Sequence, residues 1–187
     1  MSLAQVYALV CLLWFTTELV GTRIATGIRA QGLDRSSLGA IWITLLLSIL
    51  TASIVQKLGP GDWHEHKRVL LAAATLLVVV GGAIRLTAIL TLKKFFTVRV
   101  TILSDHRLIR RGLYAHVRHP SYLGALIGFF GVGLGMCNWL SLLIVFLPIL
   151  GAFLYRIRVE ESALRQRFGR EYEVYCRSTK RLVPWLY

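Results

Sequence analysis

The chain has 187 residues, of which 56% are apolar, and its mean hydropathy is positive. This is too apolar for a soluble domain of this length, so the composition indicates an integral membrane protein. The formal net charge of +13 would suggest nucleic-acid binding in a soluble protein. In a membrane protein, however, basic residues follow topology, and we expect no nucleic-acid partner.

Five apolar runs approach the ~20 residues that a spanning helix needs: 3–20, 38–55, 69–92, 122–136 and 139–155. The first run lacks a basic n-region and a small-x-small cleavage site, so we interpret it as a retained helix. We therefore predict an all-α integral membrane protein with five transmembrane helices in a single domain, 1–187. Its first part, 1–92, holds three spans, and 93–187 carries the long polar segments where we expect the chemistry.

Basic residues are distributed unequally over the two sides of this five-span topology. One side has only Lys57, Lys67 and Arg68, whereas the other has Arg23, Arg29, Arg35, Lys93, Lys94, Arg99, Arg107, Arg110, Arg111, Arg118 and every Lys and Arg from Arg156 onward. By the positive-inside rule, the N-terminus is outside and the C-terminus is cytoplasmic. The excess of basic residues also suits contact with anionic lipid.

Two further site types are excluded by position. Cys11, Cys137 and Cys176 fall in a span, at an outer hairpin and in the cytoplasmic tail, so they cannot pair with one another. His64 and His66 are two residues apart, which is poor geometry for one metal-binding helix face, and they lie on the outer side. We expect neither a disulfide nor a metal.

The sequence also contains patterns that are typical of helix packing and of helix ends. Gly124 with Gly128, and Gly131 with Gly135, form two GxxxG spacings that allow close helix approach in lipid. After Arg158 the pattern becomes amphipathic, because Leu164, Phe168, Tyr172 and Tyr175 recur at three- and four-residue steps. This pattern predicts one cytoplasmic C-terminal helix, ended by Pro184 near the interfacial residues Trp185 and Tyr187.

The stretch GLYAHVRHPSYLG places polar aromatic and basic residues at the start of the fourth apolar run. Pro120 suits the first turn of a helix, and the free amides after it point to the polar side with the positive end of the helix dipole. Arg118 and His119 precede it, so a carboxylate could bind there. The alternative is a set of contacts between these side chains and lipid headgroups.

A second polar cluster, RIRVEESAL, lies where the fifth run leaves the membrane. Arg156 and Glu160 are four residues apart on one helix face, and Glu161 is beside them. An ordinary salt bridge is one reading, yet charges near a bilayer are costly unless they are paired or functional. If the bundle brings both clusters together with Tyr114 and Tyr122, the resulting pocket could hold a zwitterion.

The segments HRLIRRGLYAHVRHPSYLG, RIRVEESAL, FGREYEVY and RLVP, with the CN hairpin turn, occur in an order that resembles the isoprenylcysteine carboxyl methyltransferase family, membrane enzymes that use S-adenosylmethionine. The resemblance covers about 106–184. It implies a cytoplasmic cofactor pocket formed by His106, Arg107, Leu108, Ile109, Tyr114, His119, Pro120, Ser121, Tyr122 and Glu160. It also implies that Arg118 and Arg156 are catalytic residues that meet the methyl acceptor, with Glu161 in the substrate site. Arg99 departs from the polar amide of some relatives.

The resemblance implies methyl transfer to a lipophilic acceptor, such as a prenylcysteine carboxylate, and we expect a cytoplasmic site that opens sideways to the bilayer. A carboxylate is ionised at pH 7 and needs no general base, whereas an amine would need one, for which Glu161 is the nearest candidate. We expect a prokaryotic inner membrane, or the endoplasmic reticulum in a eukaryote. The alternatives are a phospholipid N-methyltransferase, an NADPH-dependent membrane reductase, and a small transporter or structural subunit.

Two charged residues fall inside the apolar runs. Arg85 lies about two turns from the cytoplasmic end of the third run, where it could join the pocket or extend to the interface. Glu18 lies near the cytoplasmic end of the first run and could pair with Arg23 or with Arg85.

The charge asymmetry makes the topology testable. After replacement of the native cysteines, a membrane-impermeant thiol reagent on intact cells should label a cysteine introduced at Asp62 and not one introduced at Ser178, because the positive-inside rule puts Asp62 outside. Labelling at Ser178 alone would mean the opposite orientation.

Overall fold

The computed structural model describes residues 1–26, 36–93, 96 and 108–183. Within these residues the chain forms α-helices and short 3₁₀ turns, with isolated bridges and no strand. In chain order the elements are α1 (Leu3–Thr26), α2 (Ser36–Leu58), η1 (His64–His66), α3 (Lys67–Leu92), η3 (Gly112–Ala115), α4 (Pro120–Leu134), α5 (Trp139–Phe168) and α6 (Arg170–Ser178).

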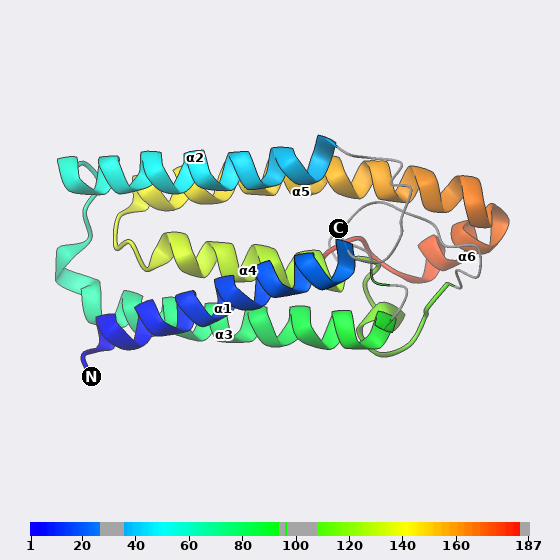
Figure 1. Cartoon of the computed structure of the whole chain (residues 1–187), viewed down its shortest axis with the longest axis horizontal. Helices are drawn as coiled ribbons and strands as arrows, with labels where there is room; N and C mark the ends of the chain where they lie inside the picture. The colour runs from blue at the N-terminus through cyan, green and yellow to red at the C-terminus, as the bar shows by residue number, and fades with distance from the viewer. Residues whose placement is uncertain (27–35, 94–95, 97–107, 184–187) are drawn as a thin grey trace.

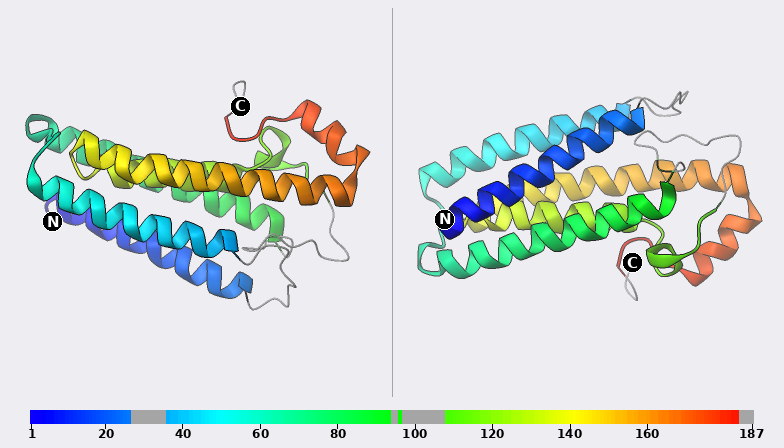
Figure 2. Two further views of the ribbon diagram at one scale, coloured as in Figure 1. Left: turned by 90° about the horizontal axis from the view of Figure 1, so that it is seen from above. Right: turned by 60° about the horizontal axis from the view of Figure 1, so that its bottom comes forward.

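The helices α1 to α5 run lengthwise beside one another as an elongated bundle (Figure 1). The central helix is α4, which packs against both α3 and α5, while α1 packs on α3 and α2 packs on α5. The C-terminal part of α5 extends beyond the other helices, and α6 then folds back toward them (Figure 2). One end of the bundle therefore has extra elements, and these surround the N-terminus of α4.

The contact between α3 and α4 requires residues without side chains. A Cβ added at Gly124 would lie 2.6 Å from the backbone N of Arg85 and from the carbonyl O of Gly81, which is closer than atoms can approach. A Cβ at Gly128 would lie 2.6 Å from the ring of Trp14 on α1. Both predicted GxxxG spacings are helix contacts, because Gly131 meets α3 and Gly135 meets Tyr7 of α1 in the same way.

An aromatic core lies between these helices. The rings of Trp14 and Phe129 are 4.9 Å apart in an edge-to-face arrangement, and Phe129 lies 6.4 Å from Phe153 of α5. Phe153 in turn lies 5.3 Å from Tyr122. Such aromatic pairs favour fixed relative orientations, so the core joins three helices and reaches the first turn of α4.

Three helices of the described residues are long and apolar enough to cross a membrane: Gly39–Leu58, Lys67–Leu92 and Trp139–Phe168. Two further apolar helices, Leu3–Leu19 and Pro120–Leu134, are shorter than the usual span. Large apolar side chains are exposed along the bundle, among them Leu12, Ile43, Leu46, Leu76 and Leu90. Such an apolar surface suits contact with lipid, while the count of five spans stays a prediction.

The amphipathic stretch after Arg158 is divided between two helices and does not form the single C-terminal helix predicted from it. Helix α5 continues without a break past Tyr155 to Phe168, and α6 is a separate helix. Gly169 lies between them with φ of +49°, a backbone conformation that side chains disfavour and glycine tolerates. The chain can therefore turn sharply at Gly169, whereas Pro184, Trp185 and Tyr187 lie outside the described residues.

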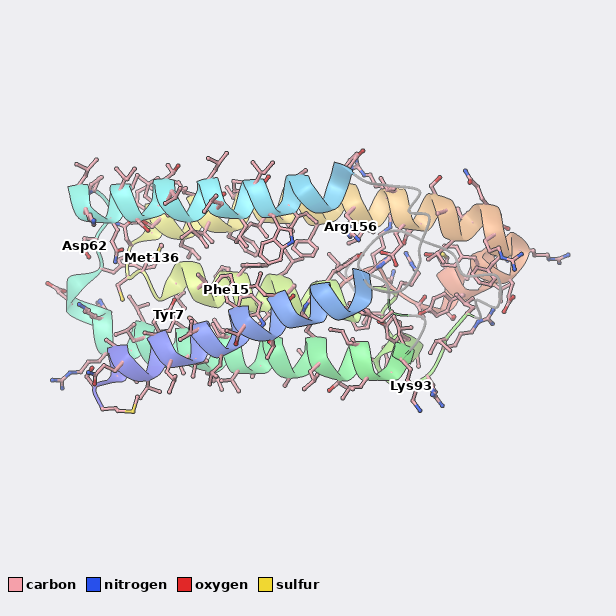
Figure 3. All side chains as sticks on the ribbon, viewed as in Figure 1. Tyr7, Phe15, Asp62, Lys93, Met136 and Arg156 are labelled. Carbon is pink, nitrogen blue, oxygen red and sulfur yellow. The ribbon has the colours of Figure 1, made fainter. Side chains whose placement is uncertain are left out.

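At the opposite end of the bundle, the hairpin before α5 is fixed by a polar residue. The side chain of Asn138 accepts a hydrogen bond from Ser141 N at 2.8 Å and donates one to Pro60 O at 2.7 Å, so it caps α5 and holds the α2–α3 connection. Asp62 and Met136 mark this end in Figure 3, and Arg156 lies toward the other end. Ser178 is the last residue of α6, and Figure 1 shows α6 at the end of the bundle opposite the α2–α3 connection that contains Asp62.

The close contact of α3 and α4 predicts a contrast between two glycines. Gly124→Ala should lower the stability by about 1–3 kcal/mol, because the added methyl group forces α3 and α4 apart. Gly151→Ala should be neutral or slightly stabilising, because its added Cβ would meet nothing within 4 Å and alanine favours a helix. Thermal melting of both variants in detergent measures the difference, and equal melting temperatures would contradict it.

Candidate active site

The candidate site begins at the N-terminus of α4. This helix starts at Pro120, in the first turn as the sequence predicts, with His119 before it. The backbone N–H groups of Tyr122 and Leu123 both donate to the carbonyl O of His119. His119 therefore closes the first turn with its own backbone, and its side chain lies beside those of the first helical residues.

The hydroxyl of Tyr122 joins two charged residues of α5. Arg156 Nε donates to this oxygen at 3.0 Å, and the hydroxyl donates to Glu160 Oε2 at 2.6 Å. Arg156 is only 3% exposed, whereas the side chain of Glu160 is 31% exposed. The Tyr122 hydroxyl thus connects a buried cation, Arg156, with a partly exposed carboxylate, Glu160.

His119 lies beside both acidic residues of α5. Its ring stacks on Tyr122, with centroids 5.5 Å apart and planes 5° from parallel. Its Nδ1 lies 3.9 Å from Glu160 Oε2, and its Nε2 lies 3.5 Å from Glu161 Oε1. The position of this imidazole therefore depends on both carboxylates.

Glu161 is the centre of a second group of charges. Its side chain is 1% exposed, and it accepts hydrogen bonds from Arg118 Nε at 2.9 Å, Arg181 Nε at 3.1 Å and Arg165 Nη2 at 3.4 Å. Each arginine comes from a different part of the chain, namely the segment before α4, the C-terminal tail and α5 itself. A buried carboxylate with this many donors holds those parts together.

Arg118 extends this group to the tail. Its Nη1 donates to the carbonyl oxygens of Cys176 and Thr179. The backbone is fixed as well, since Arg118 N donates to Lys180 O at 2.8 Å and His119 N donates to Arg181 O at 3.0 Å. The amides of these two residues, along with those of Tyr122 and Leu123, are thus engaged within the chain, which leaves few of the free amides that the sequence predicted for an anion.

Tyr114 is a buried residue of η3 that lies beside the site. Its side chain is buried, at 6% exposed, and its carbonyl accepts a hydrogen bond from the Tyr175 hydroxyl of α6 at 2.7 Å. Burial, helped by the nearby negative charge of Glu160, raises the pKa of the Tyr114 hydroxyl above its usual value. At neutral pH this hydroxyl therefore keeps its proton and can act as a donor.

The sequence-predicted residues thus fall into two connected groups. His119, Tyr122, Arg156 and Glu160 meet in one of them, and Arg118 with Glu161 meets the tail in the other. Pro120 begins α4, Ser121 contacts Arg85, and Leu108 and Ile109 are half-buried. His106, Arg107 and Arg99 lie outside the described residues.

Sequence reasoning missed Arg165, Arg181 and Thr179. The spacing of Glu161 and Arg165, four residues on one helix, could have indicated the first of them. The two tail residues have no such local signal, because Arg181 reaches Glu161 and Thr179 reaches Arg118 only through the fold. Among the described residues, no group of three or more His, Cys, Asp or Glu side chains could hold a metal ion.

The chain is similar in sequence and fold to known proteins. The chain is 38% identical over 113 residues to a probable protein-S-isoprenylcysteine O-methyltransferase of Oryza sativa subsp. indica, a match that covers 59% of each chain. It is 37% identical over 113 residues to the protein-S-isoprenylcysteine O-methyltransferase of Saccharomyces cerevisiae, covering 59% of this chain and 47% of that one. The structure of a eukaryotic intramembrane Ras methyltransferase matches with a TM-score of 0.60 and 27% identity, covering 73% of this chain and 52% of that one.

The apolar helices and the charged cluster at one end of the bundle define a helical membrane protein. The model of the isoprenylcysteine carboxyl methyltransferase (ICMT) family matches residues 73–166, which is half of the chain. The chain therefore belongs to this family. It spans about three-fifths of the length of the Oryza relative that it matches. The family-model match begins within α3, so α1 and α2 lie outside that match.

The Glu161 cluster predicts a large effect from a small change. Glu161→Gln should destabilise the protein by about 3 kcal/mol, because it leaves buried arginines without their anion. Glu171→Gln is the control, since its ion pair with Arg110 is exposed, with side chains 58% and 40% accessible, and should contribute about 0–1 kcal/mol. Thermal melting in detergent, with limited proteolysis of the tail, measures both changes. A Glu161→Gln protein as stable as Glu171→Gln would contradict the role given to this carboxylate.

Proposed function

We propose that this protein transfers a methyl group from S-adenosylmethionine to the carboxylate of a lipophilic acceptor of the prenylcysteine type. The observation that carries the proposal is the Tyr122 hydroxyl held between Arg156 and Glu160. This arrangement puts a cation for the acceptor carboxylate next to an anion for the cofactor. The names of the matched relatives support the same reaction.

The residues around Glu160 fit the cofactor. S-Adenosylmethionine supplies an electrophilic methyl group on a sulfonium centre, and it also carries an ammonium and ribose hydroxyls that need acceptors. Glu160 is partly exposed, and its Oε1 accepts no hydrogen bond from the described residues, while Oε2 is held by Tyr122. Glu160 is therefore oriented and still able to accept from a ligand. The remaining cofactor residues in this proposal are His106, Arg107, Leu108, Ile109, Tyr114, His119, Pro120, Ser121 and Tyr122.

Arg156 and Arg118 are the proposed catalytic residues, and their task is to position the acceptor. A planar guanidinium can hold a carboxylate through two parallel hydrogen bonds. Arg156 is buried and fixed by Tyr122, which limits its freedom before substrate arrives. Arg118 uses Nε and Nη1 within the protein, but its Nη2 has no partner among the described residues. That nitrogen can therefore meet the acceptor.

The state of Glu161 favours a carboxylate acceptor over an amine. An amine must lose a proton before it reacts, and Glu161 is the nearest candidate base. This carboxylate is buried and already accepts from Arg118, Arg165 and Arg181, and such donors favour its ionised form and lower its basicity. A carboxylate acceptor needs no base, so the surroundings of Glu161 suit it better. In this proposal Glu161 borders the substrate site and holds Arg118 in place.

The proposed enzyme has its N-terminus outside and its C-terminus in the cytoplasm, with the site at the cytoplasmic face. The cofactor is soluble and would enter from water, whereas a prenylated acceptor would enter sideways from the bilayer. The apolar outer surface of the helices supports such lateral access. The charged cluster at the end of the bundle supports entry of the cofactor from water.

The proposal predicts distinct defects in two variants. Arg156→Lys keeps the charge but loses the planar fork, so turnover should fall at least tenfold with little change in cofactor affinity. Glu160→Gln should weaken cofactor binding about tenfold, because a neutral amide holds an ammonium less well. Arg158→Lys is the matched control, since Arg158 lies on the same helix and is exposed, and should behave like the wild type.

The measurement uses purified protein, labelled S-adenosylmethionine and a panel of prenylcysteines, phospholipids and membrane thiols, with products identified by mass spectrometry and cofactor affinity by calorimetry. Methylated phospholipid as the main product would identify the alternative N-methyltransferase. Tight NADPH binding without S-adenosylmethionine binding would overturn the proposal in favour of a reductase.

A further inference from the structure

Arg85 is a charged residue inside an apolar helix. It lies seven residues before the end of α3 at Leu92, which is about 10 Å along the axis at 1.5 Å per residue. Its side chain is 14% exposed. A charge at such a position is costly in a membrane unless it is paired or functional, so its partners indicate what it does.

These partners come from two other helices. Arg85 Nη2 donates to Glu18 Oε2 of α1 at 2.6 Å, and Arg85 Nε also pairs with the same carboxylate. Arg85 Nη1 donates to the hydroxyl of Ser121 at 3.0 Å and to the carbonyl O of Ser121 at 3.2 Å. One guanidinium thus joins α1, α3 and the first turn of α4.

The contact between Arg85 and Ser121 matters because of where Ser121 lies in the chain. Ser121 precedes Tyr122, whose hydroxyl lies between Arg156 and Glu160. The helix backbones are in close contact here, because a Cβ on Gly124 would lie 2.6 Å from Arg85 N. A side chain fixed against Ser121 by two hydrogen bonds therefore also fixes the start of α4 and the direction of Tyr122.

We propose that Arg85 and Glu18 are positioning residues: Arg85 holds the first turn of α4 through Ser121, and Glu18 orients and neutralises Arg85. The inference rests on the proposed methyl transfer, because it gives Tyr122 its place in the site. Neither residue touches the reacting groups. Glu18 lies on α1, outside the residues that match the family model, so an N-terminal helix contributes to the site of the C-terminal half.

The chemistry of the guanidinium distinguishes positioning from simple charge pairing. Arginine offers a planar fork, which here reaches Glu18 and Ser121 simultaneously, whereas the single ammonium of lysine cannot reproduce that geometry. Arg85→Lys keeps the charge opposite Glu18 but gives up the fork. The exchange Glu18→Arg with Arg85→Glu keeps an ion pair, yet the new carboxylate cannot donate to the Ser121 carbonyl.

The experiment compares Arg85→Lys, Glu18→Gln and the exchange with the wild type. The controls are Thr16→Val on α1 and Thr75→Val on α3, whose hydroxyls donate within their own helices, to Leu13 O and Leu71 O. Turnover, the KM for S-adenosylmethionine and the melting temperature are measured for each protein. In addition, 3-fluorotyrosine is placed at position 122, and its fluorine NMR shift reports the surroundings of that ring without any reaction.

The expected result is a loss of turnover of about tenfold in Arg85→Lys and Glu18→Gln, with KM within about twofold and a displaced fluorine signal, while the controls match the wild type. The double variant with the exchanged charges should melt at about the temperature of the wild type, while its turnover should stay low. An unchanged fluorine signal in Arg85→Lys, or full turnover in the exchange, would overturn the inference. A wild-type protein that methylates nothing would refute the proposed function, and the fluorine signal would still decide whether Arg85 positions Tyr122.

Discussion

The close contact between α3 and α4 is the constraint on which the rest of the structure depends. Lipid tails are as apolar as the helices, so helices in a membrane associate through close packing and polar contacts. At Gly81 and Gly124 the two backbones approach so closely that neither residue could carry a side chain. This contact fixes the height and rotation of α4, and so it determines where His119 and Tyr122 meet α5. The geometry of the charged network therefore depends on the close approach that the glycines allow.

Two adjacent carboxylates of α5 have different surroundings and therefore different tasks. Consecutive residues on a helix point about 100° apart, so Glu160 faces Tyr122 and solvent, whereas Glu161 faces the tail and is buried. The first can accept from a ligand, and the second holds the protein together. The His119 ring lies between the two carboxylates, with one nitrogen near an oxygen of Glu160 and the other near an oxygen of Glu161.

The sequence predicted well the features that have a local pattern. Apolar runs predicted the helices, Pro120 predicted the start of α4, and the glycine spacing predicted close packing. The break at Gly169 was missed because the amphipathic period continues across it, although a glycine at this place is itself a signal for the end of a helix. The partners of Arg118 could not be predicted either. They lie 43 to 61 residues away in the chain, and such pairing leaves no periodic signal.

The N-terminal helices are needed to complete the family-matched half. Tyr7 of α1 donates to Val132 O of α4 at 2.9 Å, and Trp14 fills the space that Gly128 leaves on the same helix. On the other side, the carbonyl of Ala52 in α2 accepts from the hydroxyl of Ser141 in α5 at 2.9 Å. The matched residues 73–166 alone would expose these packing surfaces. The family match begins within α3, so α1 and α2, which lie before it, supply packing that the matched residues alone would lack.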